Sequence, residues 1–119
     1  MARNAPSIDA YGGGGFRLDG VRHEGSLLIL GDVARPWPVA ALADLTPESL
    51  QPVLDAGRAE VEFLLLGVGA RNAQPPRAVR EALQRAGIGL EFMDTPGAAQ
   101  LYNVLTSEGR HLAAALIAL

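Results

Sequence analysis

The stretch that decides the fold covers residues 61–119 and reads VEFLLLGVGARNAQPPRAVREALQRAGIGLEFMDTPGAAQLYNVLTSEGRHLAAALIAL. Apolar runs at 61–66, 88–93 and 110–119 predict three strands, separated by two segments with helical spacing. The first run shows no polar alternation, which is typical of a central strand covered on both faces. Because each helix directly follows a strand, we expect right-handed crossovers and partly parallel pairing.

Short local signals mark the ends of these helices. Pro75-Pro76 opens the first one, and a glycine follows its last turn. The second helix is predicted to start with Thr95 as its N-cap and Pro96 at its first helical position. Within it, Tyr102 lies on the apolar stripe, which predicts that this ring is part of the core.

The first half of the chain predicts strands joined by glycine turns. Asp19-Gly20, between two short alternating pieces, is a hairpin signal. The four glycines at 12–15 are interpreted as irregular, φ-positive backbone. Residues 26–30 predict a buried strand, and the prolines at 36 and 38 restrict the segment around Trp37 to an extended form. A further helix is expected to start with Thr46-Pro47 and to end before Gly57.

Together these elements predict one α/β domain over residues 1–119, with 1–7 as a loose N-terminus. We expect a layered α/β fold with a partly parallel central sheet, helices packed on it, and an N-terminal β-hairpin region.

Composition excludes several kinds of chemistry. The chain has no cysteine, and all ten of its basic residues are arginines. Thiolate nucleophiles, cysteine-based zinc sites, Schiff bases and a P-loop lysine are therefore excluded. The net charge of -3 argues against nucleic acid as the main partner. No apolar run is long enough for a signal peptide or a membrane span, so we expect a soluble, cytoplasmic protein.

Polar residues in two loops form a candidate ligand site. In open α/β sheets ligands bind beyond the carboxyl ends of the strands, where the loops at 67–74 and 94–97 are expected. A helix N-terminus and an arginine there would suit a small anion. The candidate ligand-binding residues are Gly67, Gly69, Arg71, Asn72, Asp94, Thr95 and, if its side chain reaches the rim, Asn103. The alternative is structural: the glycines permit a turn, Asn72 bonds in a turn, and Thr95 caps a helix.

No pattern predicts catalysis, a cofactor or a metal. The loop 67–72 departs from a dinucleotide fingerprint, because Asn72 replaces the third glycine and the helix starts late, at Pro75. His23 and His111 have no partners at ligand spacing. Asp94 is the one candidate general base, and its place before Thr95-Pro96 equally suits a helix dipole. The sequence leaves open whether the protein is an enzyme, but it favours a non-catalytic role.

Three aromatic residues form a second candidate surface. Trp37 lies between prolines, and with Tyr11 and Phe16 it would provide anchors for a protein partner. The alternative is that Trp37 packs in the core under a loop.

The chain resembles a family of small bacterial and archaeal proteins of unknown function that also includes the mitochondrial respiratory complex I assembly factor 3. The resemblance extends from about Tyr11 to Leu119. It depends on residues 11–16, 25–30, 63–69, 76, 80, 87–95, 98 and 102–103, and on the Glu108-Gly109-Arg110 turn. It implies a three-layer α/β fold with a mixed sheet and carries over no catalytic residues. An Arg-Thr pair is common in the family where this chain has Gln100-Leu101, which counts against an anion site.

Three hypotheses follow. The first is a non-catalytic interaction or assembly-assisting protein, linked to membrane respiratory complexes. The second is a small-molecule or anion-binding protein, or an enzyme, with Asp94 and Arg71 as its main residues. The third is an oligomeric domain with the final strand, or the aromatic N-terminal region, at its interface.

Overall fold

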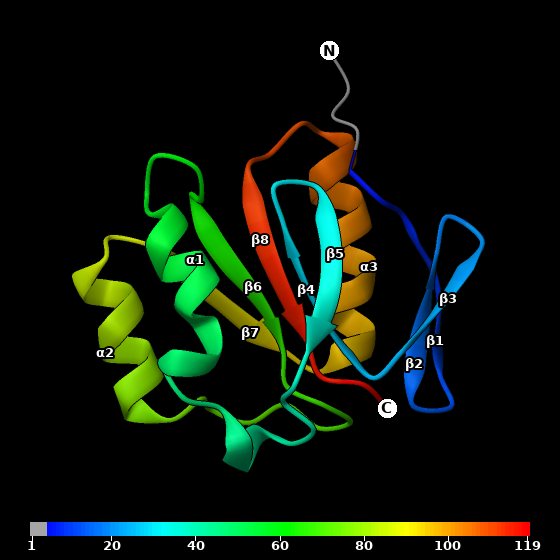
Figure 1. Ribbon diagram of the computed structural model, residues 1–119, viewed down its shortest axis with the longest axis horizontal. Coiled ribbons are helices and arrows are strands. Elements are labelled where there is room, and N and C mark those ends of the chain that lie inside the picture. The colour runs from blue at the N-terminus through cyan, green and yellow to red at the C-terminus, as the bar shows by residue number, and fades with distance from the viewer. Residues whose placement is uncertain (1–4) are drawn as a thin grey trace.

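The computed structural model describes residues 5–119, which fold into two sheets flanked by helices (Figure 1). The small sheet has the order β1-β2-β3, and the large one β5-β4-β8-β6-β7. The strands are β1 Ile8–Gly12, β2 Gly15–Leu18, β3 Val21–Glu24, β4 Ser26–Leu30, β5 Val33–Trp37, β6 Phe63–Gly67, β7 Gly89–Met93 and β8 Leu112–Leu116. The α-helices are α1 Gln51–Ala56, α2 Arg77–Arg85 and α3 Thr95–Ser107, and two 3-10 helices cover Leu42–Asp44 and Glu48–Leu50.

The large sheet is mixed, as predicted. Strand β6 pairs in parallel with β7 and β8, while β4 pairs antiparallel with β5 and β8. The last strand of the chain thus lies in the middle of the sheet, and all five of its residues are buried. The hypothesis that the final strand forms an oligomer interface is therefore wrong, because β4 and β6 cover both of its edges.

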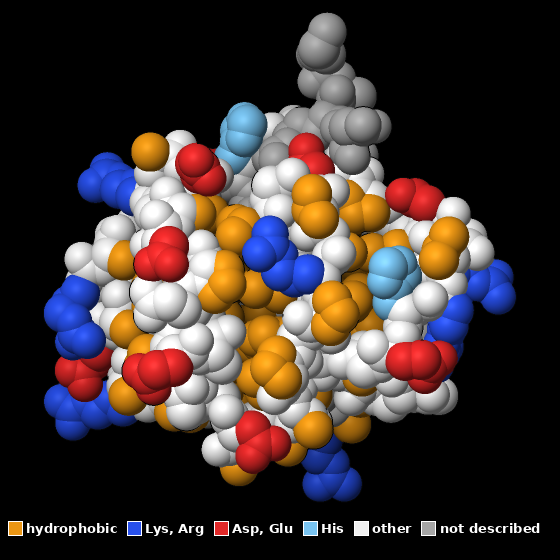
Figure 2. Space-filling view, in the orientation of Figure 1, with side chains coloured by type: hydrophobic (Ala, Val, Ile, Leu, Met, Phe, Trp, Pro, Cys, Tyr) orange, Lys and Arg blue, Asp and Glu red, His pale blue; other side chains and the backbone are white. Residues whose placement is uncertain are grey.

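Two apolar cores lie on opposite faces of the large sheet and produce the three predicted layers. One core packs under α1 and α2, in front of the sheet in Figure 1, and the other under α3 and the small sheet behind it. Strand β8 contributes to both: Ala113 and Ala115 face the first core, and Ala114 and Leu116 the second. On the face with α1 and α2, charged side chains are scattered mostly around the rim, with hydrophobic ones between them (Figure 2).

The N-terminal region is a sheet of two successive hairpins. The predicted Asp19-Gly20 turn joins β2 to β3, and both turn residues have positive φ, 49° and 81°. The four glycines are more regular than expected. Gly12 pairs with Gly15 at the ends of β1 and β2, and Gly13-Gly14 form the turn with φ of 61° and 82°.

The predicted helix after Thr46 is broken into two pieces. Thr46 does act as a cap, because its Oγ1 accepts a hydrogen bond from Ser49 N at 3.2 Å. The segment then continues as a 3-10 turn before α1 begins at Gln51. A continuous α-helix cannot cross this point, since Pro52 has no N–H to donate to the preceding turn.

Ser7, predicted to be part of a loose terminus, is held by two hydrogen bonds to Asp19. Of the predicted loose segment 1–7, residues 1–4 lie outside the described part of the chain. Ser7 N donates to Asp19 Oδ1, and Asp19 N donates to Ser7 O, both at 3.1 Å. Within residues 5–119, no helix combines the length and apolar character needed to cross a bilayer.

Candidate functional site

Thr95 joins the ends of three elements at the rim of the large sheet. Its side chain is completely buried, and Oγ1 donates to Ile117 O at 2.7 Å and accepts from Gly69 N at 3.0 Å. Its own N–H donates to Gly69 O at 2.8 Å. These bonds tie the start of α3 to the residues after β6 and β8.

The two glycines of the predicted binding loop allow this junction to form. A Cβ on Gly67 would lie 3.0 Å from Leu116 Cδ2 and 3.1 Å from both Cα and Oγ1 of Thr95. Gly69 has a φ of 108°, which strains any residue with a side chain. The glycines therefore serve close packing between chain segments at this point.

The N-cap of α3 is Asp94, so the prediction that Thr95 caps this helix is wrong. Asp94 Oδ1 accepts from Gly97 N at 2.7 Å, and its main-chain oxygen accepts from Ala98 N at 3.0 Å. A short carboxylate one residue earlier reaches the exposed amide better than a β-branched side chain that is already bonded to Ile117.

The amides at the start of α3 are consequently occupied. Thr95 N donates to Gly69, Pro96 has no N–H, and Gly97 N and Ala98 N donate to Asp94. An anion at this helix terminus would have to displace protein acceptors, so the geometry gives little support to binding there.

The remaining predicted ligand residues do not converge. Arg71 and Asn72 lie exposed on the loop after β6, and within residues 5–119 neither side chain forms a hydrogen bond or ion pair. Asn103 does not reach the rim: its Oδ1 accepts from Ile8 N at 2.9 Å, and its Nδ2 donates to Ile8 O at 2.8 Å. The structure thus brings together Gly67, Gly69, Asp94 and Thr95, but not Asn103.

The aromatic surface predicted around Trp37 does not exist as such. Trp37 is 4% exposed, and its Nε1 donates to Ser49 O at 2.8 Å. Phe16 is fully buried in the core under α3, whereas Tyr11 is 47% exposed. The expectation that Trp37 and Phe16 lie at a contact surface is wrong, because each side chain packs into one of the two cores.

The structure also has a groove between β7 and α3, which the sequence analysis did not predict. It has a volume of about 350 Å³ and is lined by Phe63, Gly89, Leu90, Glu91, Leu101, Leu105 and Arg110. One signal could have indicated it: α3 has 13 residues and none is charged. By contrast, α2 contains three arginines and a glutamate among nine residues.

Among residues 5–119, no group of three or more His, Asp or Glu side chains could hold a metal ion. The arrangement consists of packed junctions, a groove and exposed strand backbone.

These features belong to a small α/β protein whose two sheets are flanked by helices, with a groove beside α3. The chain is a member of the family described as "Protein of unknown function (DUF498/DUF598)", whose model matches residues 8–117. This confirms the resemblance found in the sequence.

Two relatives show the breadth of this family. An uncharacterised protein of Rhodobacter capsulatus is 42% identical over 110 residues, covering 92% of this chain and 82% of its own. The NADH dehydrogenase [ubiquinone] 1 alpha subcomplex assembly factor 3 of Danio rerio is 36% identical over 110 residues. That match covers 92% of this chain but only 63% of the assembly factor.

A solved structure shares the whole fold. It is described as an outer membrane protein from Bartonella henselae, is 32% identical, and superimposes with a TM-score of 0.89. The match covers 96% of this chain and 95% of that one.

Proposed function

We propose that this protein acts by binding other proteins during the assembly of a larger complex, with no catalytic step of its own. The observation that carries this proposal is the 36% identity to an assembly factor, which extends over 92% of the chain. The aligned region therefore includes most of the residues that form the core, the sheet edges and the groove.

The geometry supports the same role. Two of the side chains predicted to bind a ligand, Thr95 and Asn103, instead form hydrogen bonds that hold the fold together. The groove beside α3 offers apolar surface next to a charge-free helix. Surfaces of this kind commonly mark protein contacts.

More specifically, we propose that the protein acts in the cytoplasm during the biogenesis of a respiratory complex. It is tested by deleting the gene in the native host and resolving the membrane complexes on native gels. We expect less mature NADH dehydrogenase complex and more of its intermediates, both restored by the wild-type chain. Unchanged amounts of the mature complex in the deletion strain would contradict the respiratory link.

Small-molecule binding at the rim loops is the second candidate, because Arg71 and Asn72 are exposed there. A ligand at 100 times its dissociation constant would stabilise the fold by about 2.7 kcal/mol. A thermal-shift screen with metabolites, nucleotides and small anions therefore separates the candidates. Reproducible stabilisation that is lost in Arg71→Ala would favour this second function.

A further inference from the structure

Three edge strands, β1, β3 and β5, each carry a feature that hinders the addition of another strand. On β5, the two-residue turn pairs Leu30 with Val33, so the backbone groups of Ala34 and Pro36 point away from β4. Pro36 has no N–H to donate to an added strand. On β1, the side chain of Asn103 occupies both backbone groups of Ile8.

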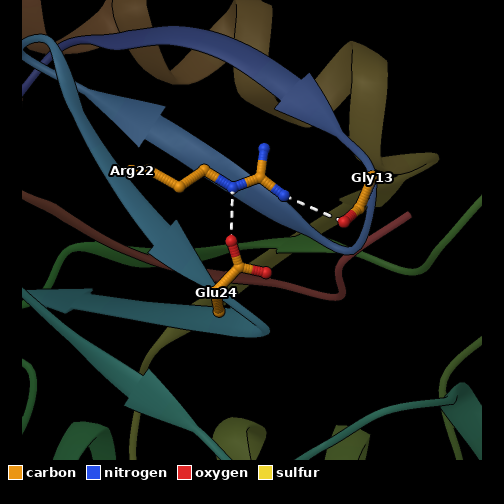
Figure 3. Close-up of polar contacts among 3 residues, drawn as sticks. All are labelled: Gly13, Arg22 and Glu24. Atoms are coloured by element: carbon orange, nitrogen blue, oxygen red, sulfur yellow. Dashed lines mark hydrogen bonds and ion pairs between the residues drawn. The ribbon is translucent and has the colours of Figure 1, made fainter.

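The edge of β3 carries an ion pair. Arg22 Nε lies 2.7 Å from Glu24 Oε1, and Arg22 Nη2 donates to Gly13 O at 2.9 Å (Figure 3). Charged side chains along an edge strand discourage pairing with another chain. Three edges are therefore each protected by a different device.

Strand β7, the edge of the large sheet, has free backbone groups. Gly89 N donates to Glu62 O and Val68 N donates to Met93 O, so residues 89, 91 and 93 face β6. In a parallel ladder the alternate residues, Leu90 and Phe92, then direct their N–H and C=O groups away from the sheet. Within residues 5–119 these outward groups form no hydrogen bond.

The groove lies directly beside this edge. Gly89 contributes no side chain to it, and Phe63, Leu101 and Leu105 provide apolar surface. Arg110 also lines the groove, with its guanidinium 5.5 Å from the centre of the Phe63 ring. A strand added to β7 would therefore point every second side chain toward the α3 side and this groove.

Glu91 argues against a second copy of this chain as the added strand. If the β7 strands of two copies paired antiparallel, all the outward N–H and C=O groups would be bonded only with Leu90 of each copy opposite Phe92 of the other. This register also places the two Glu91 residues directly opposite each other, where like charges destabilise a sheet. A basic residue opposite Glu91 is favoured instead.

We propose that the β7 edge and its groove bind an extended segment of another protein, antiparallel to β7. The segment carries a basic residue opposite Glu91 and, two positions later, a large apolar residue opposite Gly89 that enters the groove. This inference rests on the proposed function and specifies the surface and the chemistry of the partner.

The test uses two peptides and the isotope-labelled protein in NMR titrations. The probe is acetyl-Thr-Val-Arg-Val-Leu-Val-Thr-amide, and its control has Glu in place of Arg. We expect the probe to shift the amide signals of Leu90 and Phe92 and to bind at least about fivefold more tightly than the control. The Glu91→Arg variant should reverse this preference, while Glu60→Arg, an equal charge change on an exposed loop residue, should leave it unchanged.

Several results would overturn the inference. They are an absence of binding by both peptides, equal binding of both, shifts confined to other elements, or an unaltered preference in Glu91→Arg. Dimerisation of the wild-type chain through β7, seen by sedimentation, would make a second copy the occupant and overturn it as well. If the peptides fail but the chain still associates with assembly intermediates in its host, this inference falls and the proposed function stands.

Discussion

Asn103 binds the backbone of Ile8 as a neighbouring strand would, with one hydrogen bond from Ile8 N at 2.9 Å and one to Ile8 O at 2.8 Å. These two bonds connect α3 to β1 across 95 positions of sequence. They fix the small sheet on α3 and occupy the outward backbone groups of Ile8 at the edge of β1.

Asn103→Ala should loosen this attachment. Two partly buried backbone groups lose their partners, so we expect the free energy of unfolding to fall by about 1–3 kcal/mol. Denaturant unfolding measures the change, and hydrogen exchange at Ile8 should become faster. Gln100→Ala, an exposed change on the same helix, should cost less than about 0.5 kcal/mol. Equal effects from both variants would contradict a specific role for Asn103.

Thr95→Val should destabilise the protein more strongly. The variant keeps the shape but removes the hydroxyl, leaving the buried Gly69 N–H and Ile117 C=O without partners. We expect a loss of about 2–4 kcal/mol in thermal or denaturant unfolding. Thr95→Ser retains the hydroxyl and should recover most of the stability; if it does not, the methyl group and not the hydrogen bonds holds the junction.

Trp37→Ala distinguishes a core residue from an interface residue. Because Trp37 is buried and its indole bonds to Ser49, we expect the variant to lose about 3–5 kcal/mol of stability. The matched change is Tyr11→Ala, where the residue is nearly half exposed and the loss should be much smaller. Near-normal stability of Trp37→Ala would contradict the packing described here.

The ion pair on β3 predicts a measurable titration. The hydrogen bond and the positive charge of Arg22 lower the pKa of Glu24 from its ordinary value of 4.5. Ionised Glu24 thus favours the fold above its ordinary pKa, and this contribution is lost as the pH falls through the lowered folded value. NMR titration of the Glu24 carboxyl should show its pKa rising toward 4.5 in Arg22→Gln; an unchanged pKa would contradict the pairing.

Local signals predicted much of the fold. The Asp19-Gly20 hairpin, the helix after Pro75-Pro76, and Tyr102 in the core were all predicted from nearby sequence. Each depends on turn chemistry or helical spacing that acts within a few residues. The order of these elements predicted a partly parallel sheet, whereas the three layers and the mixed pairing were implied by the family resemblance.

The errors arose where distant segments decide the outcome. Thr95 was predicted to be a cap, but it is used by Gly69 and Ile117, which lie 26 and 22 positions away. Trp37 is buried in the core beside Leu50, where its indole N–H bonds to Ser49 O, 12 positions away. The open edge at β7 depends on strand order, which hydropathy alone does not specify.

The most direct measurement is hydrogen exchange of the chain isolated with a bound partner from its native host, compared with the free chain. The account predicts slower exchange at Leu90 and Phe92 of β7, with added protection along the exposed face of α3. Unchanged exchange there, together with protection confined to the loop around Arg71 and Asn72, would contradict it and favour binding at the rim.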